Sequence, residues 1–137
     1  MRISILLILI LFGSFSQKVE RDPRLVGRWM MLYSLDATGE VIKDEFYQKK
    51  YVEEYTQSGK LILDPNFLRD DMEARGIKLT TLDYAAIPTF DWTTIDNNTL
   101  QLDYGALGIR SNRYGFLRDT LIFGYSNGHT RYLLRVK

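Results

Sequence analysis

The side chains best suited by type and spacing to do chemistry are carboxylates and aromatic rings on short alternating segments. Tyr51, Glu53 and Tyr55 alternate with Val52 and Glu54, so in a strand the first three share one face. If that face points inward, Glu53 is a buried carboxylate that needs a partner. If it points outward, Glu53 is ordinary solvated surface. An inward Glu53 offers a charge-assisted hydrogen bond to a cationic or hydroxyl group of a ligand.

Two more segments place aromatic rings at the same two-residue spacing. Phe90 and Trp92 share one strand face, and Phe123 and Tyr125 share another. If these faces converge on one interior, the sequence predicts a ligand-binding wall. Its members are Tyr51, Glu53, Tyr55, Phe90, Trp92, Tyr104, Phe123 and Tyr125. The alternative is that the rings pack against one another and leave no space.

Signals for catalysis or metal binding are weak. His129 is the single histidine and the chain has no cysteine, which excludes a Cys–His nucleophile pair and a histidine-rich metal site. Asp70, Asp71 and Glu73 do not match the spacing of a calcium-binding loop. We therefore expect a protein that is not an enzyme and has no metal site and no cofactor.

The first residues have the pattern of an export signal. Arg2 precedes an apolar run at 3–12, and Ser14 and Ser16 supply the small residues that a signal peptidase reads. A membrane-spanning helix needs about 20 apolar residues, so this run is too short. We expect a signal peptide at 1–16 that is cleaved before Gln17. After cleavage we expect the protein to be periplasmic or secreted and not bound to the membrane. An uncleaved anchor and a buried N-terminal strand are the alternatives.

Composition limits the remaining choices. The chain has 18 basic and 17 acidic residues, and loss of Arg2 with the signal makes these numbers equal. This balance argues against nucleic acid as a partner, because phosphate binding needs a basic surface. Without cysteine no disulfide forms, so residues 17–137 must fold by packing alone, as one domain.

The segments that must position these residues read as short strands separated by turns. Strands are expected at 25–33, 41–46, 51–55, 60–63, 77–84, 89–95, 99–104, 120–125 and 130–136, with a helix at 66–76 and a Gly-rich loop at 105–115. Asn127 and Gly128 give the last pair a strong hairpin signal. The pattern predicts an all-β, antiparallel up-and-down β-barrel of about eight strands with one short helix between strands. Closure is favoured because it removes exposed strand edges.

Residues at the two ends of the domain resemble the lipocalin pattern. Gly27 and Trp29 open the first predicted strand, and Arg135 lies in the last. The resemblance is closest to the short lipocalin-like domains of exported bacterial proteins. It implies that Trp29 closes the base of the barrel and that Arg135 packs across its ring. A guanidinium over an indole contributes about 0.5–2 kcal/mol.

Three function classes are consistent with these observations, and the third, a barrel enzyme, is disfavoured by the single histidine. The first is an exported lipocalin-like barrel that binds a small apolar or amphipathic molecule. The second is an exported interaction protein with a filled barrel, which contacts another protein through loops such as 105–116. A cavity of several hundred Å³ would favour the first and a packed interior the second.

Overall fold

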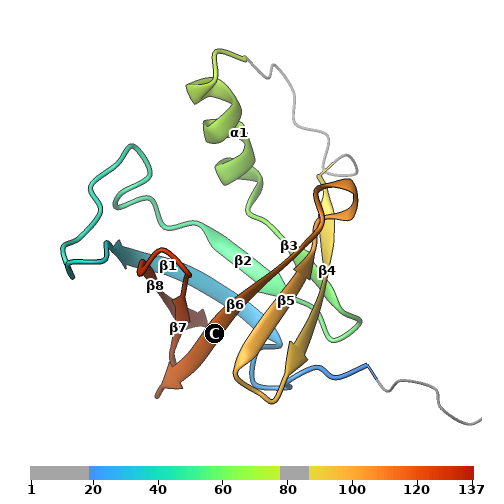
Figure 1. The fold of residues 1–137 in the computed structure, drawn as a ribbon. Helices are drawn as coiled ribbons and strands as arrows, with labels where there is room; N and C mark the ends of the chain where they lie inside the picture. Colours follow the sequence, from blue (N-terminus) through green and yellow to red (C-terminus); the bar gives the residue numbers. More distant parts are fainter. Residues whose placement is uncertain (1–18, 78–86) are drawn as a thin grey trace, which may run out of the picture.

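The computed structural model describes residues 19–77 and 87–137. The expected signal at 1–16, and residues 78–84 of the strand expected at 77–84, lie outside them. Within the described residues, consecutive strands pair antiparallel in chain order, and β8 pairs back onto β1 to close a barrel (Figure 1). The predicted up-and-down barrel with one short helix is confirmed.

The strands are β1 (Gly27–Leu35), β2 (Val52–Tyr55), β3 (Lys60–Ile62), β4 (Thr89–Ile95), β5 (Thr99–Asp103), β6 (Ile109–Leu117), β7 (Thr120–Gly124) and β8 (Thr130–Val136). Helix α1 (Pro65–Ala74) lies between β3 and β4, and the 3-10 turn η2 (Gly105–Leu107) precedes β6. Asp64 starts α1 by accepting a hydrogen bond from the Asn66 N–H at 2.9 Å, with Pro65 in the first turn. Figure 1 shows α1 beyond one end of the barrel and the described N-terminal segment at the other.

Two predicted elements are wrong. Segment 41–46 forms no strand, only a single bridge between Leu35 and Val41, because Asp44 turns the chain by accepting from the Phe46 and Tyr47 N–H groups. Most of the loop expected at 105–115 belongs to β6. The first half of that strand contains the polar run from Arg110 to Arg113, which shows no apolar alternation, and Tyr114 is its one buried residue.

A bulge in β1 decides which side chains enter the barrel. Met31 pairs with Leu133, but the next pair joins Tyr33 to Tyr132, so Leu32 is the extra residue. Tyr33 therefore faces outward and stacks on Tyr132, with ring centroids 4.8 Å apart. Ser34 faces the interior in its place.

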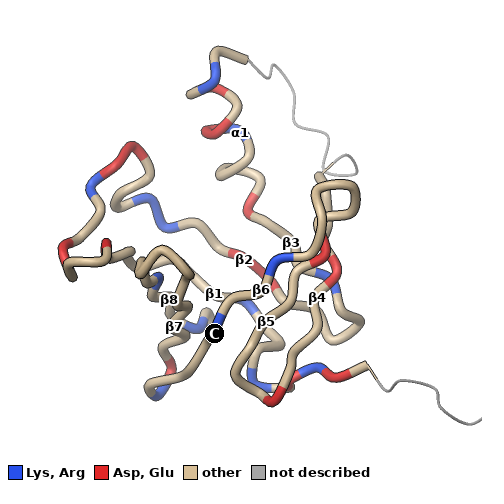
Figure 2. Tube along the Cα trace, in the orientation of Figure 1, with Lys and Arg blue, Asp and Glu red and all other residues tan. Residues whose placement is uncertain are grey.

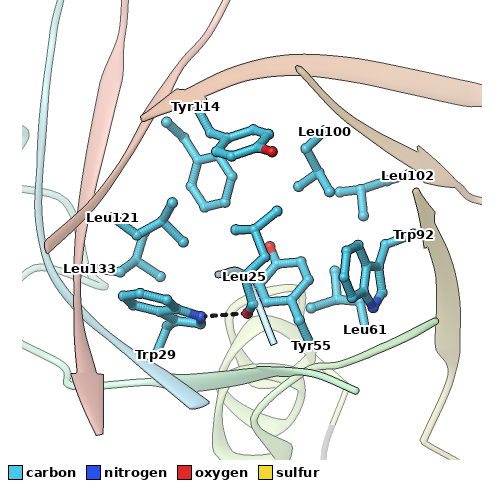
Figure 3. Close-up of a cluster of buried hydrophobic side chains, with 11 residues drawn as sticks. Leu25, Trp29, Tyr55, Leu61, Trp92, Leu100, Leu102, Tyr114, Leu121 and Leu133 are labelled. Atoms are coloured by element: carbon cyan, nitrogen blue, oxygen red, sulfur yellow. Dashed lines mark hydrogen bonds between the residues drawn. The ribbon is translucent and has the colours of Figure 1, made fainter. Parts of the chain in front are cut away.

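Trp29 belongs to the buried core and closes the end of the barrel opposite helix α1. Its indole is fully buried and donates a hydrogen bond to the Leu25 carbonyl at 2.9 Å (Figure 3). The Arg135 guanidinium lies 4.2 Å from the ring centroid and donates to the carbonyls of Arg24 and Val26. The contact that the lipocalin resemblance implies between Trp29 and Arg135 is therefore present.

Gly27 makes this closure sterically possible. Its φ is +133°, and a Cβ at this position would lie 2.8 Å from Nη1 of Arg135. Any other residue would strain the backbone and displace the guanidinium.

The segment before β1 seals the same end through a buried carboxylate. Asp22 is 1 % exposed and accepts hydrogen bonds from the Tyr114 hydroxyl at 2.7 Å and from the Arg24 guanidinium. Its own N–H donates to the Thr94 hydroxyl at 2.9 Å. Burial raises the pKa of Asp22, but the hydrogen bonds from Arg24 and Tyr114 outweigh it and hold the pKa below its ordinary value.

Removal of either member of the Trp29–Arg135 stack should cost stability non-additively. Trp29→Ala should lower the free energy of unfolding by about 3–5 kcal/mol, because it empties a buried site. Arg135→Ala should cost about 1–2 kcal/mol from lost stacking. Chemical denaturation of the single and double variants measures the coupling, since each removes the same contact. Strictly additive losses would contradict the pairing.

Asp22 should make stability depend on acid. A depressed folded-state pKa gives stability that is present above the unfolded value of about 3.9 and is lost as pH falls through the folded pKa. Asp22→Asn should cost about 1.5–3 kcal/mol near neutral pH. That cost should shrink as pH falls below about 4, where Asp22 of the unfolded wild-type chain becomes protonated before that of the folded protein. Thermal melts of both proteins across pH 2–7 test this, and a cost independent of pH would disprove it.

Candidate functional site

A cavity of about 990 Å³ occupies the end of the barrel where β1 ends and β8 begins. All eight strands of the described barrel and helix α1 contribute to its wall. The base residues Leu25, Trp29 and Arg135 are not among the described residues that line it. The barrel thus has a solid end packed around Trp29 and a hollow end near α1.

Six of the eight predicted ligand-binding residues line this cavity: Glu53, Tyr55, Phe90, Tyr104, Phe123 and Tyr125. The face of β2 that carries Glu53 and Tyr55 therefore points inward, which settles the alternative left open by the sequence. The wall also contains residues that the prediction omitted, mainly Leu61, Leu63, Phe67, Leu100, Leu102, Arg110 and Arg131.

The other two predicted residues lie elsewhere. Trp92 is fully buried in the solid half, packs edge-on against Tyr55 and donates to the Thr56 carbonyl at 3.1 Å. Tyr51 packs edge-on against Phe67 of α1, and its hydroxyl donates to Asp70 at 2.8 Å. Tyr51 therefore holds the helix against the barrel.

The most polar feature of the cavity wall is an ion pair between Glu53 of β2 and Arg131 of β8. Their closest atoms, Oε1 and Nη2, are 3.0 Å apart, and the side chains are 8 % and 23 % exposed. The guanidinium of Arg131 also lies 5.0 Å from the ring centroid of Phe123. Because β1 separates β2 from β8, the pair spans three neighbouring strands of the closed sheet.

This ion pair is incompletely satisfied. Within the described residues, Glu53 Oε1, Arg131 Nε and the Tyr55 hydroxyl are buried and have no hydrogen-bond partner. The close approach of Glu53 and Arg131 is thus an electrostatic contact whose geometry falls short of a hydrogen bond. Unpaired polar groups cost stability, so their presence on a cavity wall marks a place that a ligand or solvent completes.

The surroundings shift the pKa of each group. Burial raises the pKa of Glu53, and the attraction of Arg131 offsets only part of that rise. Burial lowers the pKa of Arg131, but Glu53 together with Tyr125 and Tyr55 outweighs it and the net pKa is raised, so the guanidinium stays charged. Burial also raises the pKa of Tyr55, Tyr104 and Tyr125, which keeps their hydroxyls neutral.

Charges at the cavity mouth are more exposed. On α1, Asp71 and Arg75 form an ion pair of 3.2 Å. Arg110 of β6 lies 5.6 Å from the ring centroid of Tyr104. Over the described chain, basic and acidic residues are interspersed (Figure 2).

The sequence held a signal for Arg131. Arg131, Leu133 and Arg135 are two residues apart on β8, so assigning Arg135 to the inner face assigns Arg131 to it as well. The contribution of Phe67 depends on how α1 packs, which no local pattern specifies.

Among residues 19–77 and 87–137, no group of three or more acidic, histidine or cysteine side chains is arranged to hold a metal ion. The same residues include no helix that is long and apolar enough to cross a membrane.

Fold and site together define an antiparallel eight-stranded barrel with a ligand-sized cavity. Comparisons of the chain with known protein families, with curated proteins and with solved structures found no match.

Breaking the buried ion pair should cost more than removing it. Arg131→Met leaves Glu53 buried without a counter-charge and should lower the free energy of unfolding by about 3–5 kcal/mol. The double variant Glu53→Leu/Arg131→Met should lose less than this single variant, because neither charge remains. Urea denaturation at pH 7 measures both. A double variant at least as unstable as Arg131→Met would show that the pair itself stabilises the barrel.

Proposed function

We propose that this protein is an exported, lipocalin-like barrel that binds a small apolar or amphipathic molecule in its hollow end. The observation that carries the proposal is the cavity of about 990 Å³ with all eight strands in its wall. Small-molecule sites usually measure about 300–1,000 Å³ and combine apolar walls with few polar groups. The filled barrel that the interaction-protein alternative requires is at odds with this volume.

The cavity wall contains apolar residues that would bury ligand surface and polar residues that would orient the ligand. Leu63, Phe67 and Phe90 are partly exposed and offer apolar surface, whose removal from water contributes about 25 cal/mol per Å². Tyrosine hydroxyls and the Glu53–Arg131 pair offer polar contacts that orient an amphipathic guest.

Support for the lipocalin-like class and for export comes from separate parts of the chain. The Trp29–Arg135 stack and the steric need for Gly27 agree with the resemblance read from the sequence. Export rests on the charge and apolar pattern of residues 1–16.

Binding should be measurable with the uncharged fluorescent probe N-phenyl-1-naphthylamine. Its emission should rise on addition of the protein, because the ring system enters an apolar cavity. Leu102→Trp adds an indole to the cavity wall and should weaken binding about tenfold or more. Leu117→Trp, at a 66 % exposed position of β6, is the matched control and should leave binding unchanged.

Both variants should first be shown to melt cooperatively. Equal binding by Leu102→Trp and Leu117→Trp would place the probe outside the barrel and contradict the proposal. Native mass spectrometry of protein from its natural host gives an independent test, since a retained molecule would appear as added mass.

A further inference from the structure

We infer that the polar group of the ligand is uncharged, a hydroxyl or an amide, and that it lies against the Glu53–Arg131 pair. This inference rests on the proposed function and specifies the ligand class. It follows from the charges, the hydrogen-bonding capacity and the exposure of the groups on the cavity wall.

The buried charges of the cavity cancel. Glu53 and Arg131 are the charged side chains of its described wall that lie deep in the barrel, and they contact each other at 3.0 Å. Asp71 and Arg75 also pair with each other, at the mouth. A ligand that brings a net charge next to the inner pair would have to be desolvated without a free counter-charge, which is costly.

Arg110 does not change this balance inside the barrel. It lies at the exposed start of β6, outside the buried part of the wall, where solvent and salt screen its charge. It would attract an anion to the mouth but does not neutralise one beside Glu53.

The hydrogen-bonding groups of the wall suit a ligand group that both donates and accepts. Arg131 only donates, an ionised Glu53 only accepts, and the Tyr55 hydroxyl does both. A carboxylate only accepts, so it would compete with Glu53 for Arg131 while repelling Glu53. An ammonium only donates, so it could hydrogen-bond to Glu53 but not to Arg131, and its positive charge would be repelled by Arg131. A hydroxyl or amide meets both partners without adding charge.

Both members of the pair are open to a ligand. The Arg131 side chain is 23 % exposed and that of Glu53 is 8 % exposed, so more of the arginine than of the glutamate is available for contact. An oxygen that accepts from Arg131 then brings its own hydrogen towards Glu53, whose Oε1 lacks a hydrogen-bond partner.

The test compares three ligands with the same ten-carbon chain: 1-decanol, decanoate and decylammonium. Each is titrated at neutral pH against N-phenyl-1-naphthylamine bound to the full chain. We expect 1-decanol to displace the probe at a concentration lower by a factor of about ten or more than the concentration that either charged ligand needs. Decanoate or decylammonium binding as tightly as 1-decanol would overturn the inference.

Charge variants separate recognition at the pair from simple hydrophobicity. Glu53→Gln leaves an unpaired Arg131 and should shift the preference towards decanoate by about tenfold, whereas Arg131→Gln should shift it towards decylammonium. The double variant Glu53→Gln/Arg131→Gln restores neutrality and should again favour 1-decanol. Glu54→Gln and Arg28→Gln, which carry the same changes outside the cavity wall, should not alter the order.

The outcomes distinguish this inference from the function on which it rests. If the fluorescent probe binds but the charge variants leave the order of the three ligands unchanged, the ligand group is not at the pair and the inference fails alone. If the probe does not bind the wild-type protein, the proposed function fails as well. Thermal melts identify any single variant that does not fold, and the other single variant then carries the comparison with the wild-type protein.

Discussion

The pairing of β1 with β8 is the constraint on which the other features depend, because it turns a row of hairpins into a closed surface. Closure removes both sheet edges and gives every strand an inner face. It also brings Trp29 opposite Arg135, and it brings Arg131 within reach of Glu53 across β1. The packed base and the polar cavity wall are therefore two products of the same strand pairing.

The two halves of the barrel differ in how completely their buried polar groups are hydrogen-bonded. Around Trp29, each polar group described has a partner: the indole nitrogen binds a carbonyl, and Asp22 accepts from both Tyr114 and Arg24. In the hollow half, polar atoms of Glu53 and Arg131 remain unpaired. The described base therefore satisfies its polar groups more completely than the wall of the cavity does.

Alternation along single strands predicted much of this arrangement. It predicted the barrel and placed Glu53 and Tyr55 on one face of a strand, but it left open whether that face points inward. It failed where the information is not local. Strand β6 is mostly exposed and is held by hydrogen bonds to its neighbours. Trp92 was assigned to the ligand wall because period two fixes a face but not a height along the barrel axis.

The bulge at Leu32 links the volume of the cavity to the strand register. Were β1 to pair without it, the alternation beyond Met31 would invert, so that Tyr33 would point into the barrel and Ser34 to solvent. A phenol ring would then stand at the mouth where a hydroxymethyl group now lies. The volume of the cavity therefore depends partly on the backbone of β1. The single extra residue at Leu32 keeps the Tyr33 side chain out of the cavity mouth.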